Sequence, residues 1–338
     1  MIDSEAFKTF INSPQFLSFL GSGSAEELAF SMLGQGEYNL NYSFTHPVTG
    51  QALVLRINTG SQMHLEKQTA YEYNALRLLI PSGRTPRPLF YLDPQETFPY
   101  GTLVMEFLPG GHLDYRKDLK KAAMILADIH RIPVDENSGL LFPASPLRAI
   151  YEESLTLASC YFSWDGRNRH TESWLRTLLH EIGVLSLDER SKAPRCIVNT
   201  ELNSGNFLMN PDGPDYLVDW EKPLLSEASQ DLAHFLSPTT TFWKTDVILT
   251  KEEMLDFTDT YIQALGDQMD PSEILSRLPL FLKVTCLRGI AWCAMAQVEY
   301  SGSQRLLKNS DTQAKIEAYL EPAFLEMIVD QYIRSDFL

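Results

Sequence analysis

Four short strand-like runs occur in the first third of the chain. In the run 38–45 hydrophobic and polar residues alternate with a period of two, as is typical of a strand because its successive side chains lie on opposite faces, and the other runs are mostly apolar. The pattern predicts four strands, at 38–45, 52–58, 87–92 and 102–107. The first two are separated by a turn at 46–50 that contains Pro47 and Gly50, so they are expected to form an antiparallel hairpin.

Apolar residues recur every three to four positions in most of the remaining chain, which is the helical period. Residues 5–33 are expected to be helical, with breaks at Pro14 and at the glycines 21 and 23. The other helical segments predicted are 63–80, 117–132, 146–190 with two or more helices, and 251–338 with several. Two short β runs, 196–198 and 216–218, interrupt this helical part.

A β-rich front half therefore precedes a mainly helical rear half, and the sequence Pro109-Gly110-Gly111 joins them. This order predicts a bilobal α+β fold, in which a small β-rich N-lobe with one key helix and a larger helical C-lobe leave a cleft between them. The expected domains are 1–108, which includes a helical extension at 1–33, and 109–338. A chain of 338 residues that is 44% hydrophobic can bury the cores of two lobes.

The net charge of −16 changes the list of expected partners. It argues against nucleic acid and against an acidic membrane surface, since both need clustered Lys and Arg. It favours a cationic substrate, or it serves only to keep the protein soluble. The apolar stretch 278–298 is interrupted by Lys283 and Arg288 and is expected to be a buried helix. Four scattered cysteines and the absence of a signal-like N-terminus favour a cytoplasmic protein.

The polar stretch 199–206 carries the strongest chemical signal. Glu201 is followed by Asn206 five residues later and by Asp219 near the next β run. A carboxylate that accepts or orients a hydroxyl proton, with an amide and a second carboxylate as hard oxygen ligands for Mg²⁺, is typical of a phosphotransferase. The alternative is a polar loop that merely closes a β-hairpin.

Arg56 is a lone cation in the apolar strand 52–58. Burial of such a charge is costly without an anionic partner, and Glu72 lies in the helix that follows. A strand cation paired with a helix carboxylate can hold nucleotide phosphates. The alternative is an edge-strand arginine that faces water.

Two further segments fit a nucleotide site. Gly34 and Gly36 precede the first hairpin, and glycines there allow backbone N–H groups to approach phosphates. The strand 102–107 runs into a tight exit, where the carbonyl of Glu106 and the N–H of Leu108 could bind an adenine edge. Taken alone, the first segment is also compatible with an ordinary turn and the second with any strand ending.

Three other polar residues are expected to be structural. Asp231 begins an amphipathic helix and is interpreted as an N-cap or a loop anchor. His130 and His234 lie on apolar helix faces, where a histidine usually finds a hydrogen-bonding partner.

Together these residues resemble the aminoglycoside phosphotransferase and choline kinase family, which has a protein-kinase-like fold. The resemblance covers about residues 30 to 240 and rests on the order of the motifs. The matching positions are the glycine-rich segment 34–42 with Asn39, then Arg56, Glu72, 105–108, 126–130, Asn206, Asp219 and 231–233. The resemblance implies ATP and Mg²⁺ as cofactors, with Asn206 and Asp219 as metal ligands.

The chain departs from this family in one loop. The family's catalytic loop usually begins His-Gly-Asp, and here it reads Asn199-Thr200-Glu201. Asn199 can still brace the loop by hydrogen bonds, and Glu201 keeps a carboxylate that is displaced by about 1 Å. The resemblance implies a small-molecule kinase with a hydroxyl-bearing, possibly amine-bearing acceptor. The alternative is a nucleotide-binding pseudokinase.

Neither the acceptor nor the oligomeric state is specified by the sequence. Selectivity in this family comes from the variable helical part. The candidates for acceptor contacts are Trp164, Asp165, Trp174, Trp243 and Glu221.

Overall fold

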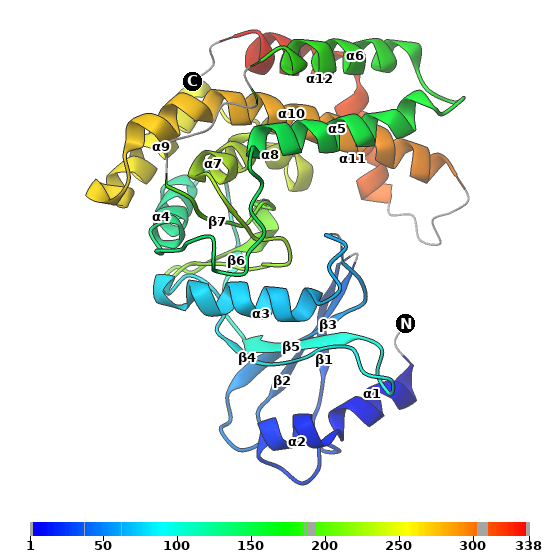
Figure 1. Cartoon of the computed structure of the whole chain (residues 1–338), viewed down its shortest axis with the longest axis vertical. Coiled ribbons are helices and arrows are strands. Elements are labelled where there is room, and N and C mark those ends of the chain that lie inside the picture. Colours follow the sequence, from blue (N-terminus) through cyan, green and yellow to red (C-terminus); the bar gives the residue numbers. More distant parts are fainter. Residues whose placement is uncertain are drawn as a thin grey trace. The chain divides into compact units, whose positions relative to one another are not determined.

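The computed structural model describes residues 3–36, 38–61, 63–185, 187, 194–302 and 310–335. The chain forms two compact units, and each has its own core (Figure 1). Unit 1 comprises Met1–Gly111, Asn137–Leu140 and Leu208–Pro223. Unit 2 comprises His112–Glu136, Leu141–Phe207 and Leu224–Leu338.

Unit 1 is built on an antiparallel five-stranded sheet in the order β1-β2-β3-β5-β4. The strands are β1 (Ser31–Gln35), β2 (Asn39–Thr45), β3 (Ala52–Asn58), β4 (Pro88–Leu92) and β5 (Gly101–Glu106). The four predicted strands are confirmed and correspond to β2, β3, β4 and β5. The predicted hairpin is β2–β3, whose register runs from Asn39 opposite Asn58 to Thr45 opposite Ala52.

The two faces of this sheet differ in polarity. One face carries Phe44, Leu53, Leu55 and Ile57, which pack with the aromatic side chains of two N-terminal helices, α1 (Ser4–Ile11) and α2 (Pro14–Leu20). Helix α3 (Gln68–Leu79) packs against β4 and β5. In Figure 1 it lies on the side of the sheet opposite α1 and α2. The face toward α3 bears Arg56, so the charged side chains around Arg56 lie on this face.

The helix predicted over residues 5–33 is correct only up to Leu20. Gly21 ends α2 in the left-handed conformation with φ 60, and residues 24–30 form no helix. Residues 31–35 instead form β1, because they pair with β2 as an edge strand of the sheet. Tertiary pairing thus overrides the helical periodicity of this segment.

Unit 2 is mainly helical. Its helices are α4 (Leu119–His130), α5 (Pro146–Phe162), α6 (Arg169–Gly183), α7 (Ala228–Leu236), α8 (Pro238–Lys244), α9 (Lys251–Leu265), α10 (Pro271–Ser301), α11 (Ser310–Leu320) and α12 (Pro322–Met327), followed by a π-helix at Ile328–Ile333. The helices predicted over 117–132 and 146–190 correspond to α4 and to α5 with α6. Residues 186 and 188–190 lie outside the described residues.

Helix α10 is the central element of unit 2. It contacts α5, α6, α7, α8 and α11, and it runs alongside α5 in Figure 1. Among the described residues it alone is long and apolar enough to cross a membrane, judged by length and composition. Most of its apolar stretch is buried in the protein, as expected for the core helix predicted at 278–298.

Short strands surround the polar stretch 199–206. The predicted run 196–198 is β7 (Cys196–Val198), which pairs with β10 (Leu224–Ser226). The run 216–218 contains β9 (Tyr216–Leu217), whose neighbour is β8 (Phe207–Met209). Because β7 and β9 belong to different sheets, the stretch does not simply close a hairpin between them.

Candidate functional site

Arg56 is the centre of a charged group in unit 1. It lies in the interior strand β3 with 6% of its surface exposed. Its Nη1 donates to Oε1 of Glu72 in α3 at 2.7 Å and to Oδ1 of Asp219 at 3.0 Å. The predicted pair of Arg56 with Glu72 is therefore present, and the alternative of a water-facing edge arginine is wrong.

Three carboxylates surround this one guanidinium, and we call Arg56, Glu72, Asp219 and Glu221 the charge cluster. Burial would lower the pKa of Arg56, but the three carboxylates together raise it, so the guanidinium stays charged. Burial raises the pKa of Glu72 to about 7; Arg56 opposes this shift and the charge of Asp219 adds to it. The cluster has more acidic than basic groups, and its oxygen donors fit a hard divalent cation such as Mg²⁺.

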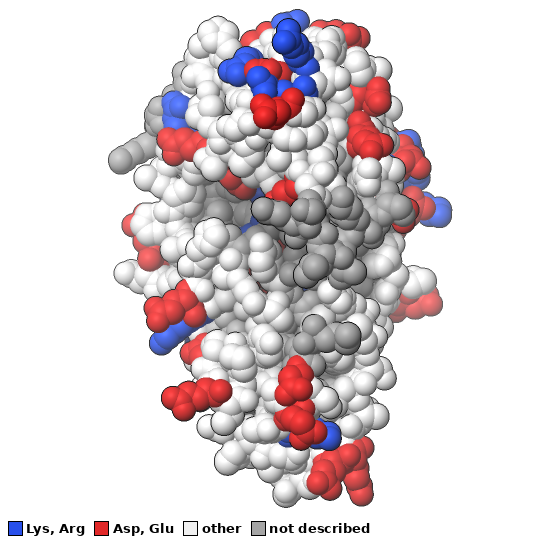
Figure 2. All heavy atoms as spheres, turned by 90° about the vertical axis from the view of Figure 1, so that its right-hand side faces the viewer, with Lys and Arg blue, Asp and Glu red and all other residues white. Residues whose placement is uncertain are grey.

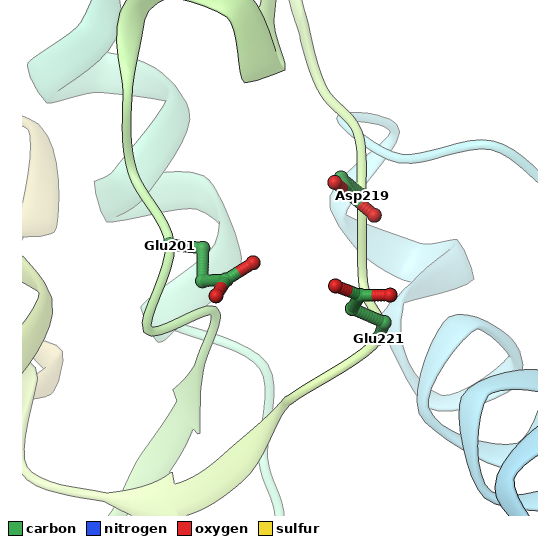
Figure 3. A group of neighbouring side chains, drawn as sticks. All are labelled: Glu201, Asp219 and Glu221. Atoms are coloured by element: carbon green, nitrogen blue, oxygen red, sulfur yellow. The ribbon is translucent and has the colours of Figure 1, made fainter. Parts of the chain in front are cut away.

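Asp219 and Glu221 project from the segment that follows β9 (Figure 3). Their carboxylates offer oxygens within 4.8 Å of each other. Helix α3 fixes the backbone of this segment, because Gln68 Nε2 donates to the carbonyl of Glu221 at 2.6 Å and the Tyr71 hydroxyl donates to that of Pro223 at 2.5 Å. Asp219 adopts φ 65, a left-handed conformation that aspartate tolerates better than most residues.

The glycine-rich turn lies between β1 and β2, and Glu37 within it is outside the described residues. The N–H of Gly36 donates to the carbonyl of Asn39 at 2.8 Å. Neither Gly34 nor Gly36 has a left-handed φ, and a Cβ added to either would meet nothing closer than 3.8 Å. The contacts of the described residues therefore do not themselves require glycine at these two positions.

Asn39 is buried at the start of β2. Its Oδ1 accepts from Nδ2 of Asn58 at 3.0 Å, and its Nδ2 donates to Oε2 of Glu221. Asn39 thus connects the glycine-rich turn with the segment that carries Asp219.

The predicted hinge lies at the end of β5. The N–H of Glu106, the last residue of the strand, donates to the carbonyl of Arg87 at 3.0 Å, and the half-buried Leu108 follows. Gly110 has φ 146, and a Cβ there would come within 2.8 Å of the Leu208 side chain. Glycine is therefore required at position 110 for both backbone conformation and space.

In unit 2, residues 199–206 form a loop that Asp231 anchors, and we call it the anchored loop. Asp231 is fully buried; its Oδ2 accepts from the N–H of Asn199 at 2.8 Å and its Oδ1 from that of Thr200 at 3.0 Å. The interpretation of Asp231 as a loop anchor is confirmed. The alternative of an N-cap is wrong, because Glu227 caps α7 and Asp231 lies inside the helix.

Both histidines have the structural roles expected of them. His130 Nε2 lies 3.3 Å from Oδ2 of Asp231, and its Nδ1 lies 2.9 Å from the Tyr261 hydroxyl. His234 Nδ1 accepts from the N–H of Leu202 at 3.2 Å. The histidines therefore support the anchored loop and its anchor.

The backbone of Glu201 is held on both sides within this loop. Its N–H donates to Oδ1 of Asn199 at 3.0 Å, which confirms the expected bracing by Asn199. Its carbonyl accepts from Nδ2 of Asn206 at 2.7 Å. This bond orients the amide of Asn206, whose oxygen is the atom that could bind a metal. The Glu201 side chain is half-buried, and Figure 3 draws it on the loop.

Thr200 adopts φ 70, in the left-handed region. That region is unfavourable for a β-branched residue by about 1–3 kcal/mol. In this conformation its N–H donates to Asp231. The site therefore keeps a strained backbone at a position where glycine would be relaxed.

Arg288 in α10 is a charged neighbour of Glu201 that the sequence analysis treated only as an interruption of an apolar stretch. It pairs with Glu153 of α5 through Nε at 2.9 Å and Nη2 at 3.0 Å. Burial opposes its charge, but Glu153 and, more weakly, Glu201 raise its pKa. Unit 2 therefore places a positive charge in the electrostatic environment of Glu201.

The residues proposed for acceptor contacts lie on separate elements. Trp164 and Asp165 follow α5, and Trp164 packs against Tyr161. Trp174 in α6 donates to His170. Trp243 in α8 packs edge-on against Trp292 of α10. Glu221 belongs to the charge cluster of unit 1.

Three residues that hold the charge cluster were not predicted from the sequence, namely Asn41, Gln68 and Tyr71. Asn41 Oδ1 accepts from Nε of Arg56 at 3.0 Å. A signal for Asn41 was present, because it is a polar residue in register with Arg56 on the neighbouring strand. Gln68 and Tyr71 bind backbone carbonyls far along the chain, and their sequence spacing gives no sign of this.

Comparison with known proteins places this geometry in context. The sequence pattern of the phosphotransferase enzyme family matches residues 30–270. No curated protein matches the sequence.

Three solved structures resemble the chain in fold. An ethanolamine kinase from Plasmodium vivax is 16% identical with a TM-score of 0.62, and the match covers 89% of this chain and 84% of that one. The choline kinase LicA from Streptococcus pneumoniae is 19% identical with a TM-score of 0.59, covering 95% and 98%. A spectinomycin phosphotransferase in complex with ADP and spectinomycin is 16% identical with a TM-score of 0.55, covering 90% and 89%. The predicted fold class, a small β-rich part and a larger helical part of the protein-kinase-like type, is confirmed.

Proposed function

Because the chain belongs to the phosphotransferase enzyme family, we propose that it transfers the γ-phosphoryl group of ATP to a hydroxyl of a small molecule, with Mg²⁺ as cofactor. The observation that carries the proposal is the ionic contact of buried Arg56 with Glu72 and Asp219. A buried cation with an acidic partner, next to a further carboxylate, suits phosphate and metal.

We propose that six residues of unit 1 bind the nucleotide and that one residue of unit 1 binds the metal. The nucleotide residues are Gly34, Gly36, Asn39, Arg56, Glu106 and Leu108, and Glu72 orients Arg56. Support comes from the two glycines that the local fold does not require and from the orientation of Arg56 by Glu72. Asp219 is the metal ligand. Mg²⁺, when bound, would neutralise phosphate charge.

We propose that the anchored loop of unit 2 carries the catalytic residues. Glu201 accepts the proton of the attacking hydroxyl, and Asn199 positions it through the bond to the Glu201 N–H. Asn206 is proposed as a metal ligand through its amide oxygen. The backbone hydrogen bonds on both sides of Glu201 support this role, because they limit where its longer side chain can reach.

We propose an acceptor that carries an amine as well as a hydroxyl. The similar structures are named for ethanolamine, choline and spectinomycin; each contains a hydroxyl together with an amine or, in choline, a quaternary ammonium group. The net charge of −16 favours such cations. On the face drawn in Figure 2, acidic side chains are widely spread and basic ones lie beside them. The proposed partners therefore include neither nucleic acid nor a membrane, and the proposed location is the cytoplasm.

Thermal unfolding with ATP and Mg²⁺ tests this proposal. A ligand present at 100 times its Kd stabilises the native state by about 2.7 kcal/mol, so the Tm should rise when ATP and Mg²⁺ are added together. Asp219→Asn should lose the part of the rise that depends on Mg²⁺. The control Asp212→Asn changes an exposed aspartate that precedes β9, and it should keep this part of the rise. An unchanged Tm of the wild-type protein at millimolar ATP and Mg²⁺ would refute the proposal.

A further inference from the structure

The guanidinium of Arg56 is held at two edges. Nη1 contacts the carboxylates of Glu72 and Asp219, and Nε donates to Oδ1 of Asn41 at 3.0 Å. Asn41 lies directly opposite Arg56 in the β2–β3 register. The hydrogen bond therefore joins two side chains that face each other across adjacent strands.

The bond to Asn41 needs an arginine. Lysine has a single terminal nitrogen and a methylene where arginine has its Nε–H. A lysine at position 56 could pair with Glu72, but it could not form this second contact at the same time. The contact with Asn41 therefore depends on arginine, and not merely a positive charge, at position 56.

Asn41 also occupies an unfavourable place for asparagine. It lies in the interior strand β2, and asparagine is depleted in strands. Its sequence neighbours Leu40 and Tyr42 pack on the aromatic core of the opposite face. On the side of Asn41 the alternating residue is Asn39, which binds Asn58 and Glu221. This face is thus lined by amides that bind charged groups of the cluster or each other.

We infer that Asn41 is a positioning residue that sets the plane of the Arg56 guanidinium for binding of the nucleotide phosphates. The inference rests on the proposed function, since it assigns phosphate binding to Arg56. The contacts with Glu72 and Asp219 are both made by Nη1, so they hold one end of the guanidinium. The bond from Nε to Asn41 holds a second point and thereby fixes the plane of the group, which sets the direction of the remaining N–H groups.

A double-mutant cycle read by calorimetric titration of ATP with Mg²⁺ tests the inference. The variants are Asn41→Leu, which removes the acceptor at similar size, Arg56→Lys, and the two combined. Loss of one such hydrogen bond should weaken ATP binding about fivefold in Asn41→Leu. Arg56→Lys should weaken it more, by about tenfold or greater. The combined variant should bind no more weakly than Arg56→Lys, since lysine makes no contact with Asn41.

Two controls separate positioning from general destabilisation. Ser43→Ala changes the same strand and the same face, and it should leave the Kd for ATP unchanged, because the Ser43 hydroxyl binds the carbonyl of Ser31. Asn41→Ala replaces Asn41→Leu if the latter does not fold. Urea unfolding without ATP reports the stability of every variant.

The inference is overturned if Asn41→Leu binds ATP as tightly as the wild-type protein, or if the two effects add in the combined variant. It is also overturned if Asn41→Leu lowers only the free energy of unfolding and leaves the Kd for ATP unchanged. Failure of the proposed function gives a different result, namely a wild-type protein that does not bind ATP.

Discussion

The charge cluster of unit 1 and the anchored loop of unit 2 are built in opposite ways. In the charge cluster, side chains bind side chains: Arg56 contacts Asn41, Glu72 and Asp219. In the anchored loop, side chains bind the backbone, as when Asp231 accepts from two successive N–H groups. The first arrangement depends on the identity of each partner, whereas the second depends mainly on the path of the chain.

The resemblance seen in the sequence implies a departure from His-Gly-Asp at three positions, Asn199, Thr200 and Glu201, and all three lie in the anchored loop. The backbone N–H groups of these residues are bound to Asp231 or to Asn199. The two bonds to Asp231 do not depend on which side chains the loop itself carries, so the backbone can keep its place when those side chains differ.

The largest effect is expected from Asp231→Ala. The substitution leaves the N–H groups of Asn199 and Thr200 and the ring of His130 without their buried partner. Unsatisfied buried groups cost about 1–3 kcal/mol each, so the free energy of unfolding should fall by about 3 kcal/mol or more. Urea denaturation measures this loss.

The matched control for this change is Asp256→Ala, which removes an exposed carboxylate that pairs with exposed Lys120. Its effect should stay within about 0.5 kcal/mol. Asp231→Asn retains one acceptor oxygen, so its loss of unfolding free energy should lie between those of Asp231→Ala and Asp256→Ala. A loss in Asp231→Ala as small as that of the control would show that the loop does not depend on this anchor.

A smaller effect of the opposite sign is expected from Thr200→Gly. Glycine relieves the strain of the left-handed φ of 70, and the N–H that binds Asp231 is retained. The free energy of unfolding should rise by about 1 kcal/mol. Thr200→Ala keeps a Cβ and hence the strain, so it should not be stabilised. Equal stabilities of the Gly and Ala variants would contradict the role of strain.

The sequence predicted the charge cluster better than it predicted the contacts that hold it. Arg56 stands out as a charge in an apolar strand, and Glu72 as a carboxylate in the next helix, so burial cost alone leads to their pairing. Four of the five strands of the sheet were predicted from strand-like runs. By contrast, β1 follows a segment of helical periodicity, and it forms only because β2 offers a partner.

The anchored loop was predicted by its residue types, but its geometry was not. Spacing indicates that Glu201 and Asn206 are close in the chain. It does not show that the Asn206 amide binds the Glu201 carbonyl, or that Thr200 is strained. These features arise because a carboxylate 31 residues downstream of Thr200 fixes the direction of the loop. Long-range hydrogen bonds of this kind leave no periodic trace in the sequence.

The central claim is that Glu201, held by its backbone, serves as the base for phosphoryl transfer. The most direct test follows ATP consumption and product formation by ³¹P NMR, with ethanolamine, choline and amino sugars as acceptors. We expect transfer by the wild-type protein and a kcat at least about 100-fold lower in Glu201→Gln, with ATP binding unchanged. Equal rates in the two proteins, or ATP binding with no transfer by the wild-type protein, would contradict it.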